Sequence, residues 1–262
     1  MGGKTDWSPI EALAQRVLEQ GEPLELTADV RALMRRSARD VAIPSKDVEK
    51  DLRNLRTATA LLRKMSRRIE DGSWRLILAE HRAHRLQDAG DLEGARRQIE
   101  KVLAVEIVPA YRKQAERVLA RIARLQKVAT SGRVDPKLPE RSQLASLLYR
   151  IDQGKPLRLT KGMCSFLRRA AAGAAISKDE TEEALASSTS AAVLLRKIMG
   201  RLRRGSKRLE RAVSRMLDCR DAGDLEGARQ QMRDLLAVEF VPMYRRAAEE
   251  NLAGLDERPP AS

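Results

Sequence analysis

The stretch Asp88-Ala-Gly-Asp-Leu-Glu-Gly-Ala-Arg96 occurs again unchanged as Asp221-Ala-Gly-Asp-Leu-Glu-Gly-Ala-Arg229, 133 residues later in a chain of 262. The same offset aligns residues 21–122 with residues 154–255 without a gap, and a one-residue shift improves the alignment before that. The chain is therefore a tandem duplication of one unit of about 120 residues. Residues that both copies share should describe a common fold or task, and residues that differ should describe what one copy does alone.

The repeated stretch predicts a turn between two helices. Gly90 can take the positive φ that a chain needs just after a helix ends. Asp91 then caps the next helix, and Glu93 lies in its first turn, where the helix dipole favours an anion. Asp88, Asp91 and Glu93 also place three carboxylates around one turn, which would allow an acid–base pair. Because capping accounts for Asp91 and Glu93 fully, we expect this stretch to be structural.

The sequence predicts an all-α fold with two tandem helical-bundle domains of about six helices each. Hydrophobic residues make up 42% of the chain and aromatic residues only 3%. The cores must therefore be built from aliphatic side chains, a composition that favours helices over sheets. In the first copy, apolar residues recur in steps of three and four from Val48 to Ile69. We expect Thr27 and its counterpart Thr160 to cap the helices that follow them.

Glycine and proline mark further expected helix ends. Gly72 and Gly205 are each followed by serine, and we expect them to end the third helix of their copy and to start the fourth. Pro109 and Pro242 interrupt the backbone hydrogen bonding of a helix, so a kink or a new helix should begin at each.

The domain organisation follows from the repeat. The first domain is expected over residues 5–125 and the second over residues 142–256, with a frayed tail over residues 257–262. Between them, residues 126–141 contain Thr-Ser-Gly-Arg and Asp-Pro-Lys-Leu-Pro. These turn-forming residues without helical periodicity predict a linker.

Charge is high in both copies. The formal net charge is +14, and each half of the chain, divided at residue 130, carries +7. Such a balance favours nucleic acid, anionic membranes or acidic proteins as partners, and a solvated arginine-rich surface is the alternative. Cys164 and Cys219 imply no disulfide framework, so a reducing compartment is expected. Residues 1–6 hold no apolar run and no stretch approaches 18 apolar residues, so we expect a cytoplasmic protein without a signal peptide or membrane partner.

The strongest functional signal is a basic stretch in the second copy. Residues 196–211 hold eight basic residues and one acidic residue, whereas Glu70 and Asp71 dilute the charge of the first copy. Phosphate oxygens suit such a cluster because arginine binds them bidentately. No aromatic residue interleaves, which argues against base stacking, and a solvated face is the alternative. Seven cations are expected to converge across the turn at Gly205 and to bind phosphate or an acidic partner: Arg196, Lys197, Arg201, Arg204, Lys207, Arg208 and Arg211.

No catalytic constellation appears in either copy. His81 and His84 are three residues apart on a helix and would be able to share a metal, but no cysteine is near them in sequence. An incidental surface pair is the simpler interpretation. Cys219 lies on an apolar stripe and is expected to be a small buried hydrophobe. We expect no enzymatic activity, no metal and no cofactor.

Three segments recur together in both copies: Gly-x-Pro-Leu-x-Leu-Thr, then Leu-Leu-Arg-Lys followed by Gly-Ser, then the repeated stretch with Ala-Val-Glu-x-Val-Pro-x-Tyr-Arg. Over nearly the whole chain this set resembles the DUSAM domain, a paralogous family of myxobacteria and their relatives. The family's name stands for a domain of unknown function, so the resemblance assigns no catalytic or binding residue.

The predicted turn also resembles the inner turn and second helix of a tetratricopeptide hairpin. Gly90, Asp91 and Ala95 have the spacing of that hairpin, in which a small residue lets two helices pack closely. The chain departs from the pattern because Pro109 comes two residues late. It also has one such hairpin in each copy rather than a stack of three.

These observations favour a non-enzymatic protein–protein interaction module, either adaptor or regulatory. Two linked copies would act together at a raised effective concentration. The alternative is a sequence-independent nucleic-acid binding protein that contacts the phosphate backbone through the basic stretch. We expect specialised function where the two copies disagree.

Overall fold

The computed structural model describes residues 5–256, and within them the chain is all-α, with twelve α-helices and no strand. The chain divides into two compact units, Met1–Arg124 and Leu125–Ser262. The predicted all-α fold with two tandem helical domains is confirmed. The tail expected at 257–262 lies outside the described residues.

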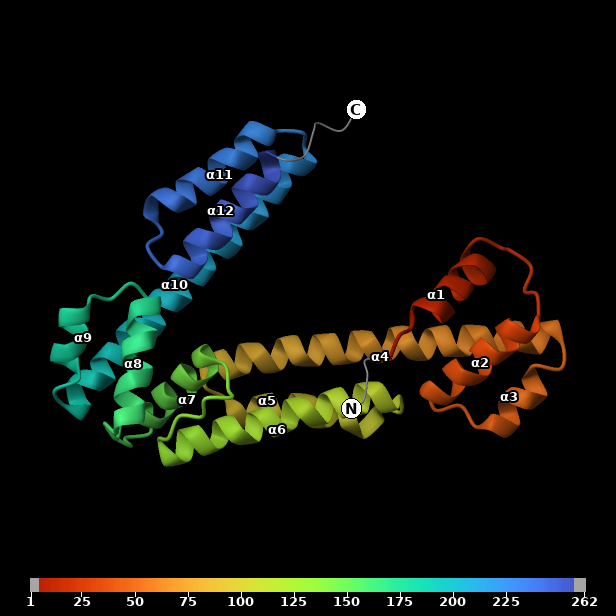
Figure 1. Ribbon diagram of the computed structural model, residues 1–262, viewed down its shortest axis with the longest axis horizontal. Helices are drawn as coiled ribbons and strands as arrows, with labels where there is room; N and C mark the ends of the chain where they lie inside the picture. Colours follow the sequence, from red (N-terminus) through yellow and green to blue (C-terminus); the bar gives the residue numbers. More distant parts are fainter. Residues whose placement is uncertain (1–4, 257–262) are drawn as a thin grey trace. The chain divides into compact units, whose positions relative to one another are not determined.

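The first unit is built around one long helix, α4. Figure 1 shows α1, α2 and α3 gathered at one end of α4, with α5 and the start of α6 beside its other half. A short π-helical turn, Gln15–Glu19, follows α1 directly. The helices are α1 (Ser8–Ala14), α2 (Ala28–Asp40), α3 (Ser45–Asp51), α4 (Leu55–Ala89), α5 (Leu92–Val105) and α6 (Pro109–Ser131).

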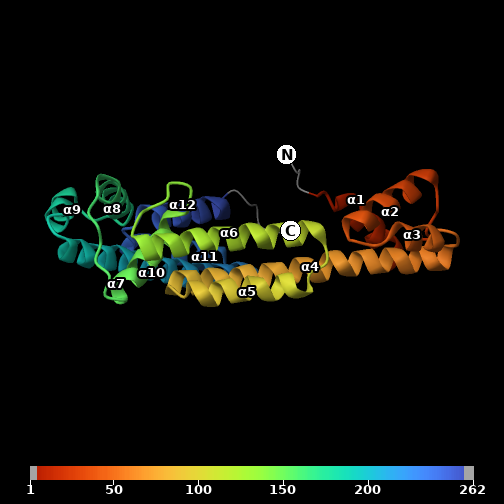
Figure 2. The ribbon, with the colours of Figure 1, turned by 90° about the horizontal axis from the view of Figure 1, so that it is seen from below.

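The second unit repeats this plan around α10. Helices α7, α8 and α9 accompany the first half of α10, and α11 and α12 lie along its second half (Figures 1 and 2). The helices are α7 (Glu140–Asp152), α8 (Lys161–Gly173), α9 (Lys178–Ala184), α10 (Ser188–Asp221), α11 (Leu225–Val238) and α12 (Pro242–Asp256).

The expectation that Gly72 and Gly205 end helices is wrong. α4 and α10 run through them, and the helix break comes earlier, where Asn54 and Ser187 cap the two long helices. Asn54 accepts a hydrogen bond from the backbone of Thr57 at 3.0 Å. The glycines were misread because glycine in a helix interior has a second use, the close approach of a neighbouring group.

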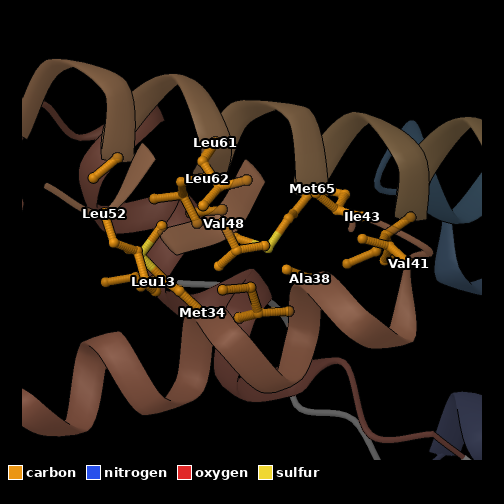
Figure 3. Close-up of a cluster of buried hydrophobic side chains, with 14 of the residues drawn as sticks. Leu13, Met34, Ala38, Val41, Ile43, Val48, Leu52, Leu61, Leu62 and Met65 are labelled. Atoms are coloured by element: carbon orange, nitrogen blue, oxygen red, sulfur yellow. The ribbon is translucent and has the colours of Figure 1, made fainter. Parts of the chain in front are cut away.

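Each half of α4 covers its own core. The first half packs its apolar side against α1, α2 and α3, and Figure 3 shows Leu62 and Met65 of α4 pointing toward Met34 of α2, with Val48 of α3 between the helices. The second half packs on α5 and α6 through a smaller aliphatic cluster that includes Ile99. Core residues of both clusters are aliphatic, as the composition predicts.

The predicted caps are confirmed. The Thr27 hydroxyl accepts from Val30 N at 3.3 Å, and the Thr160 hydroxyl accepts from Met163 N at 3.2 Å. In the repeated turn, Gly90 has a φ of 90° and Gly223 one of 82°. The carboxylates that follow them cap α5 and α11: Asp91 accepts from Gly94 N at 2.7 Å and Asp224 accepts from Gly227 N at 2.8 Å. New helices begin at Pro109 and Pro242.

The segment predicted as a linker is helical at both of its ends. α6 continues to Ser131 and α7 begins at Glu140, so the non-helical part covers residues 132–139. The last turns of α6 belong to the second unit, where Leu125 and Val128 are buried. Arg150 closes this helix end, because its Nη1 donates to the carbonyl oxygens of Ala129 and Thr130. Tertiary burial thus extends a helix into a stretch whose composition favours turns.

Candidate functional site

A tyrosine that packs on a helix glycine joins the two halves of the first unit. The ring of Tyr111, near the start of α6, lies against Gly72 so closely that a Cβ at Gly72 would come within 2.5 Å of the ring. The Tyr111 hydroxyl donates to the carbonyl oxygen of Ile69 at 3.0 Å. Tyr111 contacts both hydrophobic clusters of the unit. The glycine therefore admits the side chain that ties α6 to the middle of α4.

A fully buried carboxylate, Glu106, completes this junction. One of its oxygens accepts from Arg75 of α4 at 2.9 Å, and the other accepts from the backbone N–H groups of Ile107 and Val108 at 3.0 and 2.8 Å. Arg112 donates to the carbonyl oxygen of Glu106 at 2.7 Å. A buried charge with these partners positions the backbone between α5 and α6.

The second unit contains the same junction. Tyr244 packs on Gly205, where a Cβ would lie 2.4 Å from the ring, and its hydroxyl donates to the carbonyl oxygen of Leu202 at 2.8 Å. Buried Glu239 accepts from Arg208 at 2.8 and 3.0 Å. We call this arrangement of glycine, tyrosine, glutamate and arginine the helix junction. Sequence reasoning missed it, although the shared Ala-Val-Glu-x-Val-Pro-x-Tyr-Arg segment signalled that both copies need these residues.

The seven cations predicted to bind phosphate do not converge across a turn, because α10 is continuous through Gly205. Four of them are held by neighbours in the second unit. Two of the four form ion pairs near the start of α10: Arg196 pairs with Asp152 at 2.8 Å, and Lys197 pairs with Glu180.

The other two of these four cations, Arg201 and Arg208, have structural partners. Arg201 donates to the carbonyl oxygens of Ala174 and Ala175 at the end of α8, and Arg208 binds the buried Glu239. Both guanidinium groups lie over the ring of Phe240, at 5.0 and 5.7 Å from its centroid. These two cations stabilise the fold of the second unit. Their counterparts in the first copy make the equivalent contacts, because Arg68 binds the end of α2 and Arg75 binds Glu106.

Three of the seven cations face solvent on α10. Arg204, Lys207 and Arg211 are exposed and have no ion-pair or hydrogen-bond partner within residues 5–256. At 100° per residue they fall within a sector of about 60° on the side opposite the buried stripe, and they span about 10 Å of helix. We call these three residues the basic face.

The same turns of α4 in the first copy carry apolar side chains. Trp74 is 64% exposed, Ile77 is 54% exposed and Leu78 is 48% exposed. Trp74 and Leu78 correspond to Lys207 and Arg211 of the basic face, with Asp71 in place of Arg204. We call Trp74, Ile77 and Leu78 the apolar face. The sequence analysis did not find this exposed apolar surface.

The described residues bring no metal-binding cluster together. His81 and His84 are exposed on α4, and within residues 5–256 no group of three or more His, Cys, Asp or Glu side chains is arranged to hold a metal ion. Cys164 and Cys219 are free thiols, and Cys219 is half-buried against the α10–α11–α12 core, where full burial was expected. Among the described helices, none combines the length and the apolar character that crossing a membrane requires.

Comparison with known proteins identifies a family without a known activity. The chain belongs to the family described as "Protein of unknown function (DUF2379)", whose model matches residues 5–122 and again residues 139–255. The two matches reproduce the tandem duplication. No curated protein matches the chain, and no solved structure matches it.

Proposed function

We propose, for a chain that belongs to this family of unknown function, that the protein is a non-enzymatic interaction module, either adaptor or regulatory. The first copy would dock a protein partner on the apolar face of α4. The observation that carries the proposal is the exposure of Trp74, Ile77 and Leu78 side by side on one helix surface. Exposed apolar groups of this kind mark protein interaction sites, and tryptophan is enriched among the residues that dominate binding energy.

The internal repeat supports this proposal. The second unit builds the same helix junction with Lys207, Glu210 and Arg211 at the positions of the apolar face. The fold therefore does not need apolar residues there, and their presence in the first copy calls for another reason. Docking of a partner supplies that reason.

The test transfers the second copy's residues to the first. The variant Trp74→Lys/Leu78→Arg should fold as the wild type does but lose proteins that the wild type captures from native cells, measured by affinity capture and mass spectrometry. Leu55→Lys is the matched control, because Leu55 is 56% exposed on the same helix outside the apolar face. Capture of the same proteins by the wild type and by the double variant would reject the proposal.

The basic face favours a second candidate function, sequence-independent nucleic-acid binding. Arg204, Lys207 and Arg211 have no carboxylate partner in the described residues, so contact with phosphate would not require breaking an ion pair. Of the seven cations in the predicted cluster, this candidate needs only these three.

A salt titration tests the second candidate. Wild-type protein should shift duplex DNA with a log–log slope against salt, and Arg204→Gln/Lys207→Gln/Arg211→Gln should reduce that slope by about 0.9 for each phosphate that the variant no longer neutralises. A control with the same change in net charge, Arg82→Gln/Arg85→Gln/Lys101→Gln, should retain the slope. If DNA binding at about 50 mM salt is immeasurable, or if the two triple variants behave alike, the basic face does not bind DNA.

The resemblances to the DUSAM domain and to a tetratricopeptide hairpin are also part of this proposal. The resemblance to the DUSAM domain covers both copies. The α4–α5 and α10–α11 hairpins, each with the repeated turn between its two helices, support the likeness to a tetratricopeptide hairpin. A cytoplasmic location is part of the proposal too, supported by the two free cysteines.

A further inference from the structure

A cavity of about 380 Å³ opens in the second unit among α7, α8, α10 and α12. Its lining is mainly apolar and is formed by Leu144, Ala170, Leu202, Pro242 and Met243. The volume is at the small end of the range in which proteins bind organic ligands, and an apolar lining with a few polar groups is typical of such sites. The cavity lies beside the helix junction, because the hydroxyl of Tyr244 donates to the carbonyl oxygen of Leu202.

The rim of the cavity favours an anion. Glu140 is bound by Arg169 at 2.8 Å, so its negative charge is compensated. Arg246, on α12, is exposed and has no ion-pair partner within residues 5–256. Arg141 donates to the neutral hydroxyl of Tyr244 at 3.0 Å. Burial raises the pKa of the Tyr244 phenol, although nearby Arg141 lowers it, so the phenol stays uncharged at neutral pH.

The first copy shows what fits against the equivalent tyrosine. Before residue 21 the two copies align with an offset of 134, which places Leu13 opposite Leu147 and Trp7 opposite Arg141. The indole of Trp7 lies beside Tyr111, with the ring centroids 6.2 Å apart and the planes tilted by 42°. The first copy thus places an aromatic ring where the second copy has an arginine next to an open cavity. The position next to this tyrosine therefore accommodates an aromatic or aliphatic group.

We propose that the second unit binds a small organic anion in this cavity, with its acidic group paired to Arg246 at the rim and its apolar body on Leu202, Pro242 and Met243. This site is separate from the apolar face and from the basic face. Its ligand class is an amphipathic carboxylate or sulfonate of low molecular weight.

The probe for the test is 8-anilinonaphthalene-1-sulfonate, whose fluorescence rises in an apolar site, with uncharged N-phenyl-1-naphthylamine as its neutral counterpart. The full-length wild type should bind the sulfonate saturably. Arg246→Gln should weaken that binding about fivefold, the effect of losing one partly exposed charge pair, without weakening the neutral probe. Arg141→Trp, which introduces the residue of the first copy, should block both probes.

Circular dichroism and thermal unfolding confirm that each variant is folded before it is titrated. Arg215→Gln, which removes an exposed cation of α10 outside the cavity and outside the basic face, should bind the sulfonate as the wild type does. Arg246 is exposed, so its substitution keeps the test available if Arg141→Trp fails to fold. The proposal is overturned if the folded wild type shows no saturable binding, if Arg246→Gln binds the sulfonate as tightly as the wild type, or if folded Arg141→Trp binds as the wild type does.

Discussion

The outer face of α4 in the first copy carries Trp74, Ile77 and Leu78, whereas the same turns of α10 in the second copy carry Lys207, Glu210 and Arg211. Directly beneath these faces the two copies do not differ, because each long helix meets the following helices through the same helix junction. The contrast separates two kinds of residue. Residues of the junction are required by the fold. Residues of the outer faces are not required by it, so they can differ between the copies and serve contact with a partner.

This contrast also divides the predicted cluster of seven cations. The four with partners in the second unit have basic counterparts in the first copy, at Arg63, Lys64, Arg68 and Arg75. The remaining three, the basic face, replace an acidic residue and two apolar ones. The cations that have partners in the second unit are thus the ones that the two copies share, and the cations without partners in the described residues are the ones that differ between the copies.

The largest expected effect comes from removing the buried carboxylate of either junction. Glu106→Ala and Glu239→Ala should each lower the free energy of unfolding by about 3–5 kcal/mol, because the change leaves an arginine and two backbone N–H groups without their partner. Urea unfolding followed by circular dichroism measures this. Glu250→Ala, at an exposed position of α12, is the control and should change little. If only one of the two glutamates mattered, the junction would not be a common structural unit.

The next effect concerns the glycines on which the tyrosines pack. Gly72→Ala and Gly205→Ala should each destabilise by about 2 kcal/mol, since the new Cβ would overlap the Tyr111 or Tyr244 ring and force it to move. Gly254→Ala is the matched control, because nothing lies within 4 Å of a Cβ built there. It should be neutral or slightly stabilising, as expected for alanine in a helix. A loss at Gly254 equal to that at Gly205 would show that packing on the ring is not the cause.

These glycines also show which features of the fold could be predicted from the sequence. Caps and turns followed from local chemistry, so Thr27, Gly90 and Asp91 were predicted correctly. The role of Gly72 was not predictable in this way, because the reason for a glycine there is Tyr111, which lies 39 residues further along the chain. Local patterns assign helix ends, whereas contacts between distant segments decide whether a glycine ends a helix or admits a neighbour.

The candidate sites follow the same rule. The sequence analysis placed the basic stretch on two helices that meet at Gly205, whereas all of it lies on one helix, and only the partners of Arg201 and Arg208 show that these two cations serve the fold. The cavity of the second unit was not predictable at all. Its lining comes from four helices, and no spacing along the chain brings Leu144, Leu202 and Met243 together.

A smaller effect is expected at the repeated turn. Asp91→Ala and Asp224→Ala each remove an N-cap and should cost about 1 kcal/mol. The two losses should be equal within error, because the capping distances are 2.7 and 2.8 Å. Urea unfolding of the two single variants and of the double variant measures this. A loss of binding or of another activity without a loss of stability would instead revive the acid–base interpretation of this turn.

The smallest effect concerns an exposed ion pair that both copies contain. Arg35 forms an ion pair with Glu49 at 2.7 Å, and Arg168 forms one with Glu182 at 2.6 Å. The hydrogen bonds of these pairs lower the pKa of both carboxyl groups from the ordinary 4.5. A carboxyl group whose pKa is lower in the folded state stabilises the fold above its unfolded pKa, and this contribution is lost as the pH falls through the folded value.

Glu49→Gln and Glu182→Gln should therefore lower the urea midpoint slightly at pH 7, and the difference from the wild type should shrink as the pH falls below about 4.5. A difference that persists or grows toward acid pH would mean that the pairs act through packing rather than charge. Both copies keep this pair, yet little stability depends on it, because solvent screens exposed charges. Agreement between the copies therefore shows what they inherited from one ancestral unit, and only burial, as at Glu106 and Glu239, shows which inherited contacts the fold requires.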